Sequence, residues 1–480
     1  MRLSALFGRV FPQDPEILGV TADSRKVGPG VLFAALPGVT VHGRAFAAQA
    51  VAAGAAAVLS DAPIEGLDAP VIVEADARRA YALAAAAFWG EQPQVCVAVT
   101  GTNGKTSVAG FCRQIFAAAG LDAASMGTLG VVMGDEQLTP PGMTTPDAGD
   151  VARILADLAK RGATHLALEA SSHGLDQRRL DGVKLAAGGF LNLTQDHLDY
   201  HGDMATYLAA KLRLFETLLP PGAPAVLNAD SQAYPAFEAA ARRAGQPVLS
   251  FGERGEYLKL VSRQPTSGGQ VLSIALDGQA HEVRLPLIGA FQASNALAAA
   301  GLCLAVGEKA DSVLSALEQL EGAPGRLQRI GEGARGGAAV VDYAHTPDGL
   351  ETVLRALRPH AEGRLIVVFG CGGDRDRGKR PIMGEIAQRL ADVVVVTDDN
   401  PRTEEPAPIR AQILATSPGA CEIADRREAI FAAAAMLSPG DLLVVAGKGH
   451  EQGQIVGDRI IPFDDAAETR AALGLETDHG

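Results

Sequence analysis

The sequence predicts an α/β fold of about three domains built on parallel sheets. A chain of 480 residues is too long for one ordinary core, since domains average roughly 150 residues. Short apolar runs of strand type alternate with helical stretches along the chain. Hydrophobic residues make up 47% of the chain but aromatic residues only 5%, which favours Ala-rich helices packed on parallel sheets over a β-sandwich.

Two breaks in this alternation divide the chain. One is the Gly- and Pro-containing stretch at residues 88–93, and the other is Gly-Ala-Pro-Gly-Arg at residues 322–326. We therefore expect domains at residues 1–88, 89–322 and 323–480. The first should be a small α/β unit with a helix at residues 45–53.

The two larger domains should each contain a parallel sheet. Residues 258–287 lack helical periodicity and should form antiparallel strands before a helix at residues 293–307. The other strands are expected at residues 95–100, 164–169, 189–194, 225–227, 247–250, 338–341, 365–369, 393–396 and 442–445.

Composition excludes several classes of protein. The formal net charge of −14 argues against a nucleic-acid partner, because binding a phosphate backbone needs a broad basic face. The five Cys are scattered without a C-x-x-C pair, so neither a disulfide framework nor a zinc site is indicated. No leader-like N-terminus and no stretch of about 18 unbroken apolar residues is present. We expect a cytoplasmic protein with no membrane insertion.

A phosphate cradle is predicted where the apolar run at residues 95–100 ends in a Gly-rich turn that opens a helix. Backbone N–H groups of such a turn and the helix N-terminus converge on one anion. Lys105 would reach the outer phosphates, and the Thr106 hydroxyl would ligate a bridging magnesium ion. The strict motif has Gly where this chain has Val99, so only its shorter form is met. A plain strand-to-helix turn is the alternative.

Glu169 and His197 are a second pair of candidates, because each follows an apolar strand at the edge where open α/β sheets bind ligands. A magnesium ion between phosphates accepts carboxylate and sometimes imidazole ligands. For His197 alone, a hydrogen-bonded structural role is the alternative.

Four motifs, which follow one another in the order of the family, resemble those of the Mur ligases, and the resemblance as a whole covers all three expected domains. They are Gly-Thr-Asn-Gly-Lys-Thr at 101–106, Glu-Ala-Ser-Ser-His-Gly at 169–174, Asp-His-Leu-Asp-Tyr-His at 196–201 and Asp-Tyr-Ala-His-Thr-Pro at 342–347. The resemblance implies the three-domain Mur ligase architecture: an N-terminal UDP-binding domain, a central P-loop ATPase domain with a parallel sheet, and a C-terminal Rossmann-like amino-acid-binding domain.

The resemblance also implies ATP and Mg²⁺ sites. Lys211 lies in a helix-forming run and would otherwise be read as a solvated Lys; the family's matching Lys is carbamylated to N6-carboxylysine and helps hold a second magnesium ion. Arg326 could instead cap a linker. The implied catalytic residues are Lys105, Glu169, His197 and Lys211, and the implied metal ligands are Thr106, Glu169, His197 and carbamylated Lys211. The implied ATP contacts are Gly101, Thr102, Asn103, Gly104, Lys105, Thr106, Ser107, Asn295, Arg326 and Asp342.

For the other two substrates the resemblance implies separate contacts. Arg179 would supply the counter-charge for a carboxylate, whereas Thr144 and Thr145 could equally form a plain turn. The implied contacts to the UDP-linked substrate are Ser24, Gly38, Val39, Thr40, Thr144, Thr145, Ser171, Gln177 and Arg179. The implied contacts to the incoming amino acid are Arg375, Asp399, Asn400, Pro401, Arg402, Gly447 and Glu451.

Arg402 and Glu451 indicate which amino acid is added. A far end that carries both a carboxylate and an ammonium needs an Arg and an acidic partner. Family members that add L-lysine lack this Arg, so its presence points to meso-2,6-diaminopimelate. A loop with a surface Arg at residues 399–402 is the alternative.

The resemblance thus implies an ATP-dependent, ADP-producing ligase of peptidoglycan precursor synthesis. It would join meso-diaminopimelate to the D-Glu γ-carboxylate of UDP-N-acetylmuramoyl-L-alanyl-D-glutamate through an acyl phosphate. We expect a monomer. The alternatives are the L-lysine-adding counterpart, a folylpolyglutamate synthase-like ligase, and a non-catalytic nucleotide-binding interaction protein. The Asp-Ser-Arg at residues 23–25 argues against the folylpolyglutamate synthase-like ligase, and the intact set of catalytic candidates argues against the non-catalytic protein.

Overall fold

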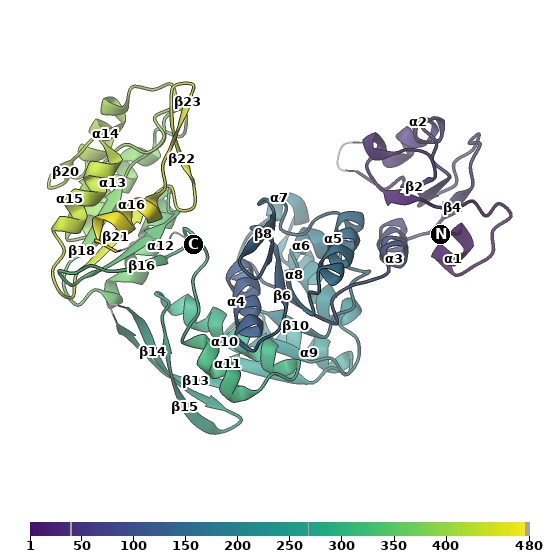
Figure 1. The fold of residues 1–480 in the computed structure, drawn as a ribbon, viewed down its shortest axis with the longest axis horizontal. Helices are drawn as coiled ribbons and strands as arrows, with labels where there is room; N and C mark the ends of the chain where they lie inside the picture. Colours follow the sequence, from purple (N-terminus) through teal and green to yellow (C-terminus); the bar gives the residue numbers. More distant parts are fainter. Residues whose placement is uncertain (39–40, 267, 476–480) are drawn as a thin grey trace. The chain divides into compact units, whose positions relative to one another are not determined.

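The structure is a computed structural model that describes residues 1–38, 41–266 and 268–475. The chain divides into two compact units, Met1–Leu258 with Ala298–Val313 and Lys259–Leu297 with Leu314–Gly480. Figure 1 labels their helices and strands.

The first unit begins with a small parallel sheet whose strands lie in chain order. These strands are β1 (Gly19–Thr21), β2 (Val31–Ala34), β3 (Ala57–Ser60) and β4 (Val71–Val73). The helical segments are α1 (Leu3–Phe7), η1 (Ser24–Lys26), η2 (Gly43–Phe46), α2 (Ala47–Ala52) and α3 (Ala77–Trp89). The small α/β unit predicted for this part of the chain is confirmed, and its expected helix appears as η2 and α2.

A larger sheet follows in the same unit, with the strand of the phosphate loop in its interior. Within this unit the strand order is β12-β11-β10-β5-β9-β6-β7-β8, and all strands from β12 to β6 are parallel. The strands are β5 (Val95–Thr100), β6 (Ala123–Gly127), β7 (Gly130–Met133), β8 (Glu136–Thr139), β9 (His165–Glu169), β10 (Ala187–Phe190), β11 (Ala225–Asn228) and β12 (Val248–Gly252). Because neighbouring parallel strands end at one edge, the polar residues that follow β5, β9 and β10 are brought together.

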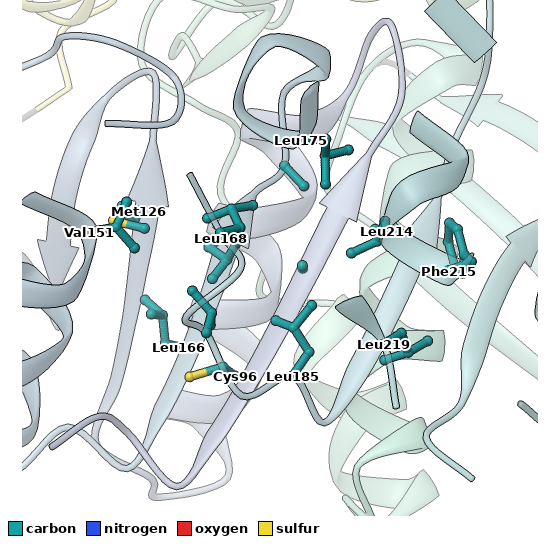
Figure 2. Packing of buried hydrophobic residues seen from close by; sticks show 14 of the residues in the cluster. Cys96, Met126, Val151, Leu166, Leu168, Leu175, Leu185, Leu214, Phe215 and Leu219 are labelled. Carbon is teal, nitrogen blue, oxygen red and sulfur yellow. The ribbon is translucent and has the colours of Figure 1, made fainter. Parts of the chain in front are cut away.

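Helices cover this sheet and fix its edge. They are α4 (Lys105–Ala118), α5 (Ala148–Lys160), α6 (Ser172–Asp176), α7 (Leu198–His201), α8 (Met204–Arg213), the π-helical turn η3 (Leu214–Leu218) and α9 (Tyr234–Arg243). The core beneath them joins Cys96 of β5 and Leu168 of β9 to Leu214 and Phe215 of η3 (Figure 2). The burial of this apolar surface holds α8 and η3 against the sheet. In the described residues, no helix is both long and apolar enough to cross a bilayer.

The second unit contains the antiparallel strands expected before residue 287. β14 and β15 pair as a hairpin, with Gln270 opposite Leu285. The elements of this part of the chain are β13 (Leu258–Thr266), β14 (Gly269–Leu276), β15 (Gln279–Leu285), α10 (Ala290–Ala305) and α11 (Ala310–Leu317). The predicted helix therefore begins three residues earlier than expected and ends two residues earlier.

The rest of the second unit is a sheet of order β16-β17-β21-β18-β19-β20, parallel except for β16. Its strands are β16 (Gln328–Glu332), β17 (Ala338–Asp342), β18 (Leu365–Phe369), β19 (Val393–Val396), β20 (Cys421–Glu422) and β21 (Leu442–Ala446). Its helices are α12 (Pro347–Leu357), η4 (Arg358–His360), α13 (Lys379–Leu390), α14 (Pro406–Leu414), α15 (Arg426–Ala435) and α16 (Asp465–Ala472). A separate hairpin is formed by β22 (Gly453–Val456) and β23 (Arg459–Pro462).

Both faces of this C-terminal sheet are covered, which explains its apolar strands. Ala338 and Val340 of β17 pack into one core, and Ala339 and Val341 pack into the other. Strands buried on both faces read as continuous apolar runs, and the four predicted here are confirmed as β17, β18, β19 and β21.

Candidate active site

The phosphate loop joins β5 to α4. Gly104 has a φ of 91°, a left-handed conformation that Gly adopts at little cost. Asn192 clamps the loop, because its Oδ1 accepts the N–H groups of Thr102 at 3.1 Å and Asn103 at 2.9 Å. Its Nδ2 donates back to the Asn103 carbonyl at 3.1 Å. The donors that remain for an anion are therefore those of Gly104 and the first turn of α4, fewer than the sequence predicts.

Lys105 and Lys211 converge on this loop. Lys105 Nζ donates to the carbonyl oxygens of Gly101 at 2.9 Å and Thr102 at 2.8 Å. Lys211 is only 1% exposed, donates to the same Gly101 oxygen at 2.7 Å, and lies 4.6 Å from the ring centre of Tyr207. Burial, with the charge of Lys105, lowers the pKa of Lys211 to about 6. Its amine is thus mostly neutral, and nucleophilic, near pH 7.

Glu169, the last residue of β9, is buried beside the phosphate loop. Its Oε1 accepts the Thr128 N–H at 2.9 Å. Burial raises the pKa of Glu169, against the opposing effects of the Thr128 N–H, the Lys105 charge and the Thr106 hydroxyl. A Cβ on Gly127 would lie 2.0 Å from Glu169 Oε1, so only Gly leaves room for this carboxylate. The Glu169 carboxylate and the Thr106 hydroxyl therefore lie within hydrogen-bonding distance of each other and offer two oxygen atoms that can ligate a metal ion.

His197 lies farther along the same edge and is half exposed. It precedes α7 with a φ of 52°, and its ring centre is 4.8 Å from that of His173 and 6.3 Å from that of Tyr207. Its ring Nε2 lies 3.4 Å from Asp196. Within the described ranges, no group of three or more His, Cys, Asp or Glu side chains is placed to hold a metal ion.

Four of the nine predicted contacts to the UDP-linked substrate, Thr145, Ser171, Gln177 and Arg179, lie in one hydrogen-bonded network. The Thr145 hydroxyl donates to the Glu169 carbonyl at 2.9 Å and accepts the Ser171 N–H at 3.1 Å. Arg179 donates to the Thr145 carbonyl at 2.6 Å and to Gln177 Oε1 at 2.8 Å. Because Thr145 is buried and its hydroxyl is engaged on both sides, its side chain supports the loop.

The remaining predicted contacts of this set are distributed between two places. The Thr144 hydroxyl lies 2.9 Å from that of Thr128, which links it to the Glu169 region. Ser24 opens η1 and Gly38 is exposed in the N-terminal part of the unit. Val39 and Thr40 lie outside the described residues.

In the second unit, the three predicted nucleotide residues are Asn295, Arg326 and Asp342, and each contacts residues that were not predicted. Asn295 Nδ2 donates to Gln292 Oε1 at 3.0 Å, and both side chains are buried. The Arg326 guanidinium lies 4.8 Å from the ring centre of Tyr343. Asp342 accepts the N–H groups of Leu327 at 2.7 Å and Ala344 at 2.8 Å, and burial raises its pKa. Asp342 thus fixes the backbone next to Arg326.

The predicted amino-acid contacts gather after β19 and β21. Asn400 Nδ2 donates to Glu451 Oε2 at 3.0 Å. Arg402 has a φ of 52° and donates through Nη1 to the Gly373 carbonyl at 2.9 Å. Gly447 has a φ of 119°, and a Cβ there would lie 2.6 Å from Asp399 Oδ2. A side chain at position 447 would therefore clash with the buried Asp399 carboxylate.

Two other predicted residues border this loop. Arg375 is exposed and donates to the Asp374 carbonyl at 3.1 Å. A Cβ on Gly373 would lie 1.9 Å from the Pro401 carbonyl oxygen, so the loop after β18 packs tightly against residues 399–402. We call residues 399–402 together with residues 447–451 the selecting loops.

Four residues that contact the predicted site were missed by the sequence analysis: Asn192, Thr128, Tyr207 and Lys448. Asn192 follows strand β10 at the ligand-binding edge, so its position was a usable signal. Tyr207 lies four residues before Lys211 on α8, a spacing that places both on one helix face. Thr128 lies in a short turn without a recognisable pattern.

Comparisons with known proteins identify the family of the chain. The chain matches the family models described as Mur ligase middle domain over residues 99–303, Mur ligase, glutamate ligase domain over residues 325–449, and Mur ligase family, catalytic domain over residues 16–95.

Two curated relatives carry the same name, UDP-N-acetylmuramoyl-L-alanyl-D-glutamate--2,6-diaminopimelate ligase. That of Caulobacter vibrioides is 68% identical over 478 residues, 98% of each chain. That of Brucella melitensis is 54% identical over 474 residues, 98% of this chain and 97% of the relative. A solved structure titled with the same ligase is 35% identical, covers 99% of both chains and superposes with a TM-score of 0.82.

Proposed function

The chain belongs to the Mur ligase family, and on that basis we propose that it joins meso-2,6-diaminopimelate to the D-Glu γ-carboxylate of UDP-N-acetylmuramoyl-L-alanyl-D-glutamate. The observation that carries the proposal is the 68% identity, over 98% of each chain, to a relative named for these two substrates. Such a reaction belongs to the synthesis of the peptidoglycan precursor. The domain bounds 1–88, 89–322 and 323–480 remain predictions.

ATP supplies the energy for the amide bond. Its γ-phosphoryl group passes to an oxygen of the D-Glu γ-carboxylate, which yields an acyl phosphate and ADP. The neutral amine of the amino acid then attacks the acyl carbon, and the tetrahedral intermediate loses phosphate as the nitrogen loses its proton. The reaction needs groups that hold the phosphates, offset their charge and orient the amine.

The phosphate loop holds the phosphates. Gly104 and the first turn of α4 offer N–H donors to them. Lys105 leaves the carbonyl oxygens of Gly101 and Thr102 to contact the outer phosphates, where its charge favours the transition state. Asn192 keeps the loop in shape by occupying the N–H groups of Thr102 and Asn103.

Mg²⁺ fits the residues present near this loop. Glu169 and Thr106 supply hard oxygen donors, which Mg²⁺ prefers, and His197 lies along the same edge. When bound, the ion would offset the charge that develops on the transferred phosphoryl group.

Lys211 fits carbamylation. Only an unprotonated amine adds to carbon dioxide, and a pKa of about 6 leaves most of the Lys211 amine in that form at pH 7. The resulting N6-carboxylysine would place an anion beside Lys105 and extend the oxygen-donor set of Glu169 and Thr106.

Arg402 and Glu451 support the choice of meso-diaminopimelate. Arg402 would pair with the distal carboxylate and Glu451 with the distal ammonium of this amino acid. L-Lysine has no distal carboxylate. If this chain added L-lysine, Arg402 would therefore have no carboxylate of the substrate to pair with. Both named relatives add 2,6-diaminopimelate according to their names, which also speaks against a folylpolyglutamate synthase-like ligase.

Phosphate release tests this function. Purified protein should release phosphate from ATP and Mg²⁺ only when UDP-N-acetylmuramoyl-L-alanyl-D-glutamate and meso-diaminopimelate are both present, with one UDP-tripeptide formed per phosphate. A pteroylglutamate-dependent reaction would support the folylpolyglutamate alternative, and absence of turnover with every set would support a binding protein. We place the reaction in the cytoplasm, where ATP is available, and expect a monomer by sedimentation.

A further inference from the structure

Lys448 is a buried cation within the selecting loops. Its side chain is fully buried, and its Nζ donates to Asn400 Oδ1 at 2.9 Å and to Glu451 Oε2 at 3.3 Å. Asn400 Nδ2 donates to the same Glu451 oxygen at 3.0 Å. Lys448, Asn400 and Glu451 therefore form a closed triangle of hydrogen bonds, which we call the Lys448 triangle.

The triangle joins two segments that are distant in the sequence, and a further hydrogen bond ties it to β22. Asn400 follows β19, Lys448 and Glu451 follow β21, and the Ile455 N–H of β22 donates to Asn400 Oδ1 at 2.9 Å. A carboxamide oxygen accepts two hydrogen bonds, and those of Asn400 come from Lys448 and Ile455. The Asn400 oxygen is therefore engaged within the protein and supports its neighbours.

Glu451 is held by one oxygen only. Both of its hydrogen bonds, from Lys448 and Asn400, end on Oε2. For Oε1 no protein partner is found in the ranges that the structure describes, and the side chain is 35% exposed. One carboxylate oxygen is thus anchored inside the protein, and the other is presented at the surface.

Resting on the function proposed above, we infer that Lys448 is a positioning residue for amino-acid selection, which fixes Glu451 so that Oε1 receives the distal ammonium of the incoming amino acid. A fully buried ammonium does not reach a substrate carboxylate. Its effect passes through Glu451, whose rotamers would otherwise have to be ordered when the amino acid binds. A buried Lys that served only folding would weaken all activities alike.

Two substrates isolate the distal ammonium. L-2-Aminopimelate keeps the reacting amine and both carboxylates of meso-diaminopimelate but lacks the distal amine. We define the preference as kcat/KM for meso-diaminopimelate divided by kcat/KM for L-2-aminopimelate. Lys448→Met should reduce the preference by about tenfold or more, the scale expected when a polar contact to a substrate is lost. The KM for ATP and for the UDP-linked substrate should stay within about twofold, because Lys448 contacts neither site.

Arg364→Met is the matched control. Arg364 pairs at 2.6 Å with the nearly buried Asp441, which directly precedes β21. Lys448 is the second residue after the same strand. This variant should lower the melting temperature of the same domain and leave the preference unchanged. Combining Lys448→Met with Glu451→Gln should reduce the preference no further than Glu451→Gln alone, because both act on one contact.

The outcomes separate the two proposals. Wild-type protein that ligates no diaminopimelate contradicts the proposed function before any variant is compared. An active wild type whose preference survives in folded Lys448→Met contradicts only the role of Lys448, and so does equal use of the two substrates by the wild type. If Lys448→Met does not fold, Lys448→Gln is measured in its place, because its shorter and uncharged side chain cannot reproduce the contacts of the ammonium to both Asn400 and Glu451. An unchanged preference in that variant would show that these contacts are not needed and is equally contradictory.

Discussion

Lys105 and Lys211 donate to one carbonyl oxygen, that of Gly101, at 2.9 and 2.7 Å. Burial, together with the repulsion that an ammonium on Lys211 would feel from Lys105, lowers the pKa of Lys211 to about 6. A carbamate on Lys211 would replace this repulsion by attraction. The pair thus links the phosphate loop to the modification proposed for Lys211.

Lys211→Ala should abolish ligation while the protein stays folded, because it removes the carbamate proposed to hold a metal ion rather than an apolar core side chain. Circular dichroism checks the fold, and phosphate release checks the activity. Formate or acetate should partly restore activity by placing a carboxylate in the gap. Full activity of the variant without additives would refute the carbamate.

Lys105→Ala should slow turnover by more than ~10², the scale for losing one preorganised charge at a phosphoryl-transfer site. Binding of the UDP-linked substrate, measured by calorimetry, should persist, because its contacts lie elsewhere. Lys184→Ala, at an exposed position in the same unit, serves as the control and should behave as wild type. Lost UDP-substrate affinity with normal turnover would show that the ligands are assigned to the wrong places.

Asn192→Ala should raise the KM for ATP about tenfold, since the Asn103 N–H loses its acceptor, the Thr102 N–H keeps only the backbone carbonyl of residue 192, and the phosphate loop is held less firmly. Asn192→Asp should be worse than Asn192→Ala, because it keeps the acceptor but adds a negative charge beside the phosphates. Steady-state kinetics with ATP as the varied substrate measures both. An unchanged KM for ATP in Asn192→Ala would contradict this clamp, and a milder effect of Asn192→Asp than of Asn192→Ala would contradict the effect of the added charge.

Arg402→Ala should raise the KM for meso-diaminopimelate strongly and leave the KM for ATP nearly unchanged. The wild type should discriminate against L-lysine by on the order of several kcal/mol, because L-lysine leaves the guanidinium unpaired. In Arg402→Ala the difference in efficiency between meso-diaminopimelate and L-lysine should become smaller, because the efficiency with meso-diaminopimelate falls. Arg389→Ala, an exposed Arg of the same unit, is the control. Comparable wild-type efficiency with L-lysine would refute the assignment of residues 399–402.

Glu404→Gln should change the acid stability of the second unit. Hydrogen bonds from the buried Arg380 and from the Asp374 N–H lower the pKa of Glu404 from 4.5 to about 2. A carboxyl with a lowered pKa stabilises the fold above its unfolded pKa, and this contribution disappears as the pH falls from about 4.5 to about 2. At pH 7 the variant should melt at a lower temperature than the wild type. Its melting temperature should fall less than that of the wild type as the pH is lowered from about 4.5 to about 2. The exposed neighbour substitution Glu405→Gln should follow the wild-type melting curve.

The fold was predictable where strands are buried on both faces. Residues 338–341 and 442–445 are uninterrupted apolar runs, and they form β17 and β21. β20 has two residues, and the strands β22 and β23 expose much of their surface, so neither periodicity nor an apolar run distinguishes them from loops.

The sequence indicates the candidate residues one by one, and their roles stay predictions, but it does not indicate the contacts between them. Lys105 and Glu169 follow from a motif and a strand end. Nothing in the sequence shows that Asn192 occupies two N–H groups of the phosphate loop or that Thr145 is buried. Lys448 lies between two Gly in a loop, where a Lys is normally expected to be exposed. These features depend on contacts between segments far apart in the chain.

The hairpin of β22 and β23 has a consequence for grafting experiments. Residues 399–402 do not hold their own shape: the Arg402 N–H donates to the Ile455 carbonyl at 3.0 Å, the Gly457 N–H donates to the Arg402 carbonyl at 2.7 Å, and Gln454 donates to the Asp399 carbonyl at 2.7 Å. The left-handed backbone of Arg402 costs on the order of 1 kcal/mol or more and persists because the hairpin imposes it. Transplanting Asp-Asn-Pro-Arg alone into a lysine-adding scaffold would therefore carry over the guanidinium but not its direction, and the hairpin would have to move with it.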